Sequence, residues 1–264
     1  METFRVPTAG FRLSEQDPAN SHSLDPERQQ SVLDHNRRRI AELQNVLYAE
    51  SEQSLLLILQ SMDTGGKDPI IRDVLNLTNP QACRAVAFKK AGGVEEKHDM
   101  FWRFHRAAPE RGEIVVFNRS WYDTMIASRA HGEIDENELA AVCRQICAFE
   151  SVLADQRISI VKVFLHISKD EQRKRLQERI DDPHRHWELS EADFSERKFW
   201  DGYARAYDEV ITATNTDQCP WYIIPADDRH YRDAAASVII AGALEALNPQ
   251  YPPAKFDVSS IEWE

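Results

Sequence analysis

Apolar residues along the chain follow two alternating patterns. Stretches that are apolar at nearly every position are typical of parallel strands buried on both faces. Such stretches predict strands at 55–59, 84–89, 113–117, 159–166 and 221–225. Between them, apolar residues recur at the spacing of helical turns. This spacing predicts helices over 25–50, from the loop after the first strand to about 77, over 94–107, in segments up to about 155, over 168–180, from 190 onward and over 229–247.

Two helix starts carry recognisable signals. Asp25-Pro26 opens the first long helix, where the missing N–H of proline costs nothing. Ser190 is followed by Asp193, which predicts a capping arrangement. Strands that alternate with helices predict an α/β fold with a parallel sheet covered on both faces. Ligands of such sheets bind beyond the carboxyl ends of the strands.

The same patterns divide the chain into three parts. Residues 1–24 are polar and irregular, and we expect them to form an arm that lies over the surface. Residues 25–247 form one domain, without internal repeats or an interdomain linker. The segment 248–264 carries three prolines and is predicted to be a peripheral tail.

Composition narrows the classes of protein that fit. With 42% hydrophobic and 29% charged residues, the chain reads as a soluble globular protein. Its net charge of −12 argues against a general nucleic-acid binder, and no apolar run is long enough to span a membrane.

The N-terminus lacks the apolar core of a signal peptide, so we expect a cytoplasmic location. The four cysteines lie in apolar or helical contexts and lack metal-site spacing, which favours reduced core residues.

The segment 61–68, SMDTGGKD, lies between an apolar strand and a helix, which is the context that a phosphate-binding loop requires. Backbone N–H groups near the glycines could cradle phosphates, and Lys67 would reach the transferred phosphoryl group. Asp63 is predicted to bind the metal ion, with a loop-capping side chain as the alternative. Without the flanking strand and helix, the glycines would suggest a simple turn. The other loop residues predicted to contact phosphate are Thr64, Gly65, Gly66 and Asp68.

A second group of polar residues follows the strand at 113–117. Asn118 can hydrogen-bond phosphate or magnesium-bound water but supplies no charge. Arg119 offers a planar fork suited to phosphate oxygens, and Arg129 follows near the end of the next helix. The alternative for Arg119 is a solvated surface side chain.

Basic residues are concentrated over 173–190. On a helix followed by a mobile loop, they could close over phosphates as a lid and neutralise the transferring group. The alternative is a solvated basic helix face. His184 and His186 have no further ligands nearby in sequence, so we do not predict a metal site there.

Taken together, these motifs resemble the polyphosphate kinase 2 family over roughly residues 25–245. The matching pieces include MDTGGKD at 62–68, FWR at 101–103, FNRSWY at 117–122 and LHISKDEQR at 165–173. The resemblance implies a thymidylate-kinase-like P-loop fold, a three-layer sandwich with a central parallel five-stranded sheet and a helical lid. It also implies a homo-oligomer, a dimer or a tetramer. The implied reaction, dependent on Mg²⁺ or Mn²⁺, transfers phosphoryl groups between inorganic polyphosphate and adenine or guanine nucleotides.

The resemblance also assigns roles to single residues. The asparagine at position 118, where other members have aspartate, resembles the pattern of the branch of the family that accepts AMP as well as ADP. By position, Asp63 and Lys67 match the acid and the lysine of the family's phosphate loop, and Asn118 and Arg119 match its second motif. Lys89 and Arg103 match the basic residues on the polyphosphate side. Arg179 and Arg185 match the arginines of the lid.

Four positions depart from the pattern of the family: Ser61, Pro69, Ile70 and Glu188. They keep open a second hypothesis, a degenerate homologue that binds polyphosphate or nucleotide without turnover. A third hypothesis is an ATP-dependent nucleoside monophosphate kinase. The additional basic residues exceed what one triphosphate needs, which argues against it.

Overall fold

A computed structural model describes residues 1–89 and 91–261. In this part of the chain, five strands form one parallel sheet in the order β2-β3-β1-β4-β5. The strands are β1 (Ser54–Ser61), β2 (Cys83–Ala87), β3 (Ile114–Asn118), β4 (Ile158–His166) and β5 (Trp221–Pro225). The predicted parallel sheet is confirmed, although β2 ends two residues before the predicted boundary.

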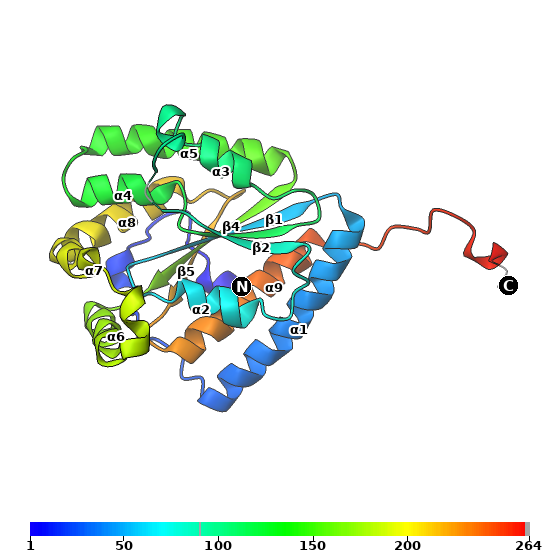
Figure 1. Cartoon of the computed structure of the whole chain (residues 1–264), viewed down its shortest axis with the longest axis horizontal. Coiled ribbons are helices and arrows are strands. Elements are labelled where there is room, and N and C mark those ends of the chain that lie inside the picture. The colour runs from blue at the N-terminus through cyan, green and yellow to red at the C-terminus, as the bar shows by residue number, and fades with distance from the viewer. Residues whose placement is uncertain (90, 262–264) are drawn as a thin grey trace.

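Helices cover the sheet on both faces and make a three-layer sandwich (Figure 1). On one face lie α1 (Pro26–Glu50), α2 (Lys67–Val74) and α9 (Arg229–Leu247). On the other face lie α3 (Trp102–Ala107), α4 (Tyr122–Ala130), α5 (Glu136–Asp155) and α8 (Trp200–Thr214). The central strand β1 is buried along its whole length, which explains its continuous apolar run.

Local chemistry sets several helix starts. The Asp25 side chain accepts the N–H of Arg28, with Pro26 in the first turn, as the sequence predicts. Ser190 and Asp193 form the predicted capping box at the start of α7 (Glu191–Ser195). The helix predicted from 190 is nevertheless not continuous, because a 3-10 segment, Glu196–Phe199, separates α7 from α8. Gly202 then lets α8 approach α4 closely, since a Cβ there would lie 2.5 Å from the carbonyl oxygen of Ala130.

The helix predicted over 94–107 is wrong in its first half. That segment holds a 3-10 turn, Glu95–Lys97, and only α3 is α-helical. His98 is extended, and the Asp99 side chain accepts the N–H of Phe101. Aspartate competes for backbone donors in this way and starts a new turn instead of continuing a helix.

The arm at 1–24 packs against the edge of the sheet. Arg5 pairs with Tyr222 in an antiparallel bridge, and the N–H of Val6 donates to the carbonyl of Trp221 at 2.9 Å. Phe11 and Leu13 are buried. The arm therefore covers backbone groups of β5 that an open edge would expose.

The C-terminal segment runs away from the body of the molecule (Figure 1). Residues 250–261 are all exposed, and the last three residues of the predicted tail lie outside the described residues. In the described part of the chain, no helix combines the length and the apolar character needed to cross a membrane.

Candidate active site

The loop between β1 and α2 depends on its two glycines. Gly65 lies against Ser61, where a Cβ would come within 2.4 Å of the serine Cβ. Gly66 has a φ of +102°, and a Cβ there would lie 2.1 Å from Nη1 of Arg232. Only glycine fits such a close approach in this backbone conformation. The loop is therefore tightly folded against the body of the protein.

Lys67 begins α2 and turns back toward the end of β1. Its Nζ donates to Oγ of Ser61 at 2.8 Å, and Oγ of Ser61 donates to the carbonyl of Met62 at 2.7 Å. Burial lowers the pKa of Lys67, with the negative charge of Asp63 opposing that shift. Ser61, one of the four residues that depart from the family pattern, thus orients Lys67.

The other two departures near the loop fit the fold. Pro69 lies in the first turn of α2, where a backbone N–H has no intrahelical partner. The Ile70 side chain is fully buried in the core. Neither residue disturbs the loop.

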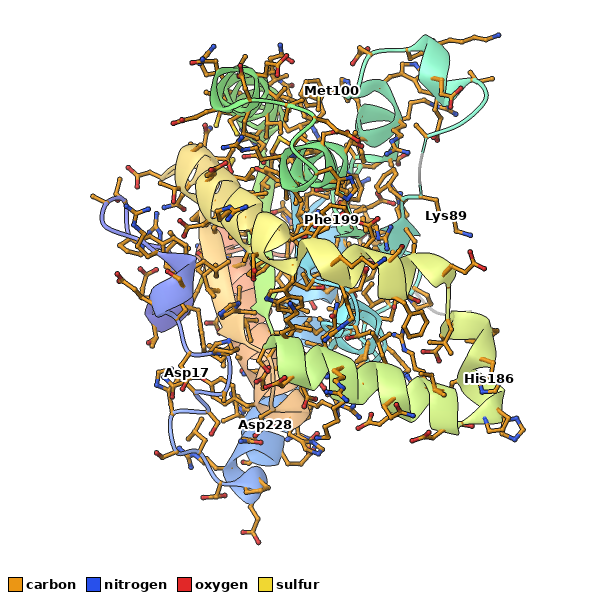
Figure 2. All side chains as sticks on the ribbon, turned by 90° about the vertical axis from the view of Figure 1, so that its left-hand side faces the viewer. Asp17, Lys89, Met100, His186, Phe199 and Asp228 are labelled. Atoms are coloured by element: carbon orange, nitrogen blue, oxygen red, sulfur yellow. The ribbon has the colours of Figure 1, made fainter. Side chains whose placement is uncertain are left out.

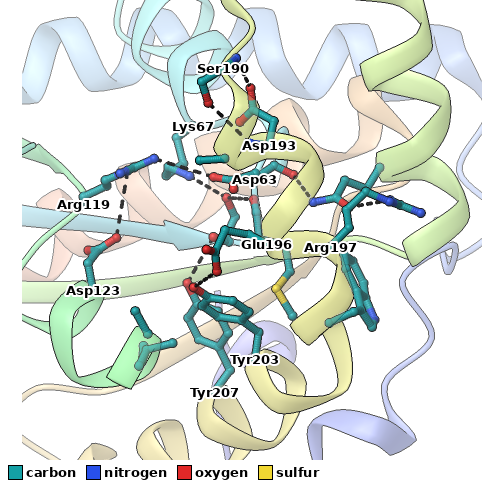
Figure 3. Close-up of a pocket in the computed structure, with 17 residues that line it drawn as sticks. Asp63, Lys67, Arg119, Asp123, Ser190, Asp193, Glu196, Arg197, Tyr203 and Tyr207 are labelled. Atoms are coloured by element: carbon teal, nitrogen blue, oxygen red, sulfur yellow. Dashed lines mark hydrogen bonds and ion pairs between the residues drawn. The ribbon is translucent and has the colours of Figure 1, made fainter. Parts of the chain in front are cut away.

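The residues after β3 complete this side of the site. Nδ2 of Asn118 donates to Oδ1 of Asp68 at 2.6 Å, so the two motifs contact each other. Arg119 has a φ of +70°, a conformation that costs a non-glycine residue energy and is held by its surroundings. Its guanidinium lies 3.6 Å from the carboxylate of Asp63 and 4.0 Å from that of Asp123 (Figure 3).

A buried amide supports this turn from below. Nε2 of Gln60 donates to Oγ of Ser120 at 2.9 Å and to Oδ2 of Asp123 at 2.8 Å. The N–H of Ser120 donates to the same carboxylate oxygen at 2.7 Å. These bonds fix the chain immediately after Arg119.

Asp63, Lys67 and Arg119 face one cleft of about 320 Å³ (Figure 3). The cleft also contains residues that the sequence analysis did not assign to the site. They come from α4, from α6 (Lys169–Asp181), and from the chain between Ser190 and the middle of α8. They are Asp123, Gln172, Ser190, Asp193, Glu196, Arg197, Trp200, Tyr203 and Tyr207. Asp123 could have been found from its place one helical turn after Arg119. Ser190 and Asp193 carry a local signal only as a helix cap, and the others come from distant segments.

Tertiary contacts hold one of these carboxylates in place. Oε2 of Glu196 lies 2.8 Å from Nε2 of His131 and accepts the hydroxyl of Tyr203 at 2.8 Å. Burial and this hydrogen bond raise the pKa of Tyr203. The phenol therefore stays protonated and keeps Glu196 oriented at the cleft.

Ten predicted residues are not among those that line this cleft. Five of them belong to the two motifs beside it: Thr64, Gly65, Gly66, Asp68 and Asn118. The other five come from elsewhere in the chain. Arg129 binds Glu209 through both Nε and Nη2, at 2.7 and 3.0 Å. Arg103 donates to the carbonyl of Lys89 at 2.7 Å, and the Lys89 side chain is exposed. The remaining two are the lid residues Arg179 and Arg185. Figure 2 shows Lys89 and His186 projecting from the same margin of the molecule in that view, from separate elements.

Arg179 and Arg185 share one carboxylate, that of Glu188. Nε of Arg179 lies 3.1 Å from Oε2 of Glu188, and Arg185 binds both oxygens, at 3.2 and 2.9 Å. The hydrogen bond from Arg185 lowers the pKa of Glu188, so the carboxylate stays ionised. Glu188, which departs from the family pattern, is thus the counter-ion of both Arg179 and Arg185.

Several carboxylates are available to a cation near the loop. No group of three or more His, Cys, Asp or Glu side chains among the described residues could hold a metal ion alone. Mg²⁺ usually binds one or two carboxylates together with substrate phosphates. Asp63 at the cleft, with Asp123 nearby, fits that pattern. Oγ1 of Thr64 is buried without a hydrogen-bond partner in the described structure, and Thr64 is not among the residues that line the cleft.

The parallel sheet, the glycine loop with its lysine after β1, and the arginine after β3 define a P-loop kinase. The model of the family described as Polyphosphate kinase 2 (PPK2) matches residues 23–252. The chain therefore belongs to the polyphosphate kinase 2 family.

Relatives and a solved structure agree with this assignment. The chain is 40% identical over 255 residues to an AMP/ADP-polyphosphate phosphotransferase of Meiothermus ruber, covering 96% of each chain. It is 38% identical to an ADP-polyphosphate phosphotransferase of Rhodopseudomonas palustris, over 94% of this chain and 93% of the other. The crystal structure of polyphosphate kinase 2 from Arthrobacter aurescens superposes with a TM-score of 0.94 at 39% identity, covering 98% of this chain and 93% of that one.

Proposed function

We propose that this protein transfers phosphoryl groups between inorganic polyphosphate and the adenine nucleotides AMP and ADP, with Mg²⁺ as cofactor. One observation carries the proposal: Asp63, Lys67 and Arg119, from two adjacent strand ends, face a single cleft. A phosphate-binding loop and an arginine that meet in this way suit a transferring phosphoryl group. The names of the two relatives cited above support polyphosphate and AMP or ADP as substrates.

The chemistry asks the protein mainly to position charge. The terminal phosphate of an acceptor nucleotide has a second pKa of about 6, so it is already ionised at neutral pH. A general base is therefore unnecessary, and catalysis depends on alignment and on stabilisation of the transferring group. Lys67 and Arg119 supply positive charge to that group, and Asn118 holds Asp68 beside the loop.

Asp63 and Asp123, which both line the cleft, are the residues that would hold the cation. When bound, Mg²⁺ neutralises part of the phosphate charge. We expect Mn²⁺ to substitute for it.

A donor and acceptor assay tests this function. The protein is incubated with AMP or ADP, with either polyphosphate or ATP as the donor, and the product nucleotides are followed. The proposal expects transfer from polyphosphate that requires Mg²⁺. Transfer from ATP alone would favour a nucleoside monophosphate kinase, and binding of polyphosphate without any product would favour a non-catalytic homologue.

The K67A variant tests the site itself. We expect K67A to abolish transfer without loss of the fold, because Lys67 is the cation of the phosphate loop that faces the cleft. K255A changes an exposed lysine of the C-terminal segment and serves as the matched control. Near-normal turnover by K67A would reject the assignment.

The homo-oligomer and the cytoplasmic location remain predictions from sequence. Light scattering coupled to size-exclusion chromatography would show whether the protein is a dimer, a tetramer or a monomer. Cell fractionation would test the location.

A further inference from the structure

The first turns of the lid helix α6 are anchored to the phosphate loop. Gln172 and Arg175 are 4% and 5% exposed, although the surrounding segment reads as a basic, solvated helix. Nε2 of Gln172 donates to the carbonyl of Asp63 at 3.2 Å. Nη1 of Arg175 donates to the carbonyl of Thr64 at 3.0 Å. Two successive carbonyls of the loop are thus held from one side.

Protein partners occupy every nitrogen of the Arg175 guanidinium. Besides Thr64, it donates from Nη2 to the carbonyls of Ala226 and Asp227, at 2.5 and 3.1 Å, and from Nε to Glu171 at 2.8 Å. The side chain therefore joins the loop, its own helix and the turn after β5. A guanidinium engaged in this way has no fork left for phosphate.

Holding a carbonyl also sets the direction of the next N–H group. The peptide unit is planar and trans, so the N–H of Thr64 points away from the carbonyl of Asp63. The bond from Gln172 fixes that orientation. The bond from Arg175 to the next carbonyl then keeps the following peptide unit from flipping. The N–H of that unit, from Gly65, donates to the carbonyl of Met62 at 3.1 Å, so the bond from Arg175 holds the fold of the loop. A loop that cradles phosphate with its other amides needs this fold before the substrate arrives.

A second buried arginine closes the loop from beneath. Arg232 is 3% exposed, binds Asp233 through Nε and Nη2, and leaves no room for a Cβ at Gly66. The loop is thus fixed between α6 on one side and α9 on the other. Its conformation is built into the body of the protein.

We propose that Gln172 and Arg175 are positioning residues, which hold the phosphate loop in its phosphate-binding conformation. Arg175 does so from outside the cleft, whereas Gln172 also lines it. The inference rests on the proposed function, because it concerns the same loop and the same reaction. It separates Arg175 from the arginines of the lid that are predicted to contact polyphosphate.

The experiment compares R175M, R175K and Q172L with two matched controls. R38M removes an exposed arginine of α1, and Q177L removes an exposed amide of α6. Steady-state kinetics with polyphosphate and hydrogen exchange of the segment 61–68 are measured for each protein. Q172L loses the hydrogen bond to the carbonyl of Asp63 and the one that Gln172 accepts from Nη1 of Arg197. It removes no charge, so it keeps the test open if R175M fails to fold.

We expect R175M to lower kcat by about 10- to 100-fold, the effect of a small misplacement of a reacting group. The KM for polyphosphate should change less than about threefold, because Arg175 does not contact it. R175K should recover part of kcat, and exchange at 61–68 should rise in R175M and Q172L but not in the controls.

Three results would overturn the inference. A higher KM for polyphosphate with unchanged kcat in R175M would make Arg175 a phosphate ligand. A lower Tm with unchanged kcat would make its role purely structural. Unchanged exchange at 61–68 in both R175M and Q172L would show that neither side chain holds the loop. If the wild-type protein fails to transfer phosphate from polyphosphate, the proposed function fails, and the exchange measurement still decides the positioning role.

Discussion

The buried ion pair between Glu150 and Lys162 allows a quantitative test of the core. Both side chains are almost completely inaccessible, at 1% and 0% exposure. Nζ of Lys162 lies 2.7 Å from Oε2 of Glu150 and donates to the carbonyl of Thr214 at 2.7 Å. Oε1 of Glu150 accepts the hydroxyl of Tyr122 at 2.5 Å and Nε1 of Trp121 at 3.2 Å. The pair therefore supports Trp121 and Tyr122, which follow Arg119 closely along the chain.

Removal of one partner leaves the other charge buried and uncompensated. The cost of breaking a buried pair in this way is about 3–5 kcal/mol. We therefore expect K162M to lower the free energy of unfolding by about that amount. For a protein of this size, the Tm should fall by about 2–4 °C for each kcal/mol.

The double variant E150M/K162M distinguishes the pair from simple packing. Removal of both charges avoids an isolated ion, so the double variant should cost several kcal/mol less than the sum of the two single variants. Urea unfolding followed by tryptophan fluorescence measures each free energy. E52Q, which removes one carboxylate of the exposed pair with Arg157, is the control and should have little effect. Additive losses in the double variant would refute the reasoning.

Further predictions concern the lid and the phosphate loop. E188Q frees the forks of Arg179 and Arg185 for phosphate, so the KM for polyphosphate should fall by about two- to fivefold, whereas D181N on the same segment should leave it unchanged. An unchanged KM in E188Q would mean that Glu188 does not compete with the substrate. Because the pKa of Lys67 is lowered and only the ammonium form binds phosphate, affinity for polyphosphate should weaken as pH rises through that lowered pKa. Titration of binding between neutral and alkaline pH should show this loss, and K67R should flatten it. G66A should lose transfer and stability together, since its Cβ would meet Arg232; an active G66A with an unchanged Tm would contradict the tight packing of the loop.

Local sequence signals predicted the sheet and the loop because both depend on short-range chemistry. The apolar run of β1 is buried throughout, and the glycines after it meet neighbours that exclude a Cβ. The capping residues Asp25 and Ser190 act within their own turns. Such features need no knowledge of distant segments.

The partners of charged side chains depend on tertiary packing and were missed. Arg129 binds Glu209, and Arg179 and Arg185 bind Glu188, so their charges are already paired in this structure. A count of basic residues could not show this pairing. The break between α7 and α8 was also missed; beyond it, α8 packs closely on α4.

The anchoring of α6 also limits how far the lid can travel. Leu176 is buried and Arg175 is bonded on three sides, so the base of the helix behaves as part of the rigid body. A swing of the predicted lid toward bound phosphates would have to begin beyond these residues. The predicted lid would then move as a short arm that carries Arg179 and Arg185, and its reach would be set by the few turns between Leu176 and the start of α7.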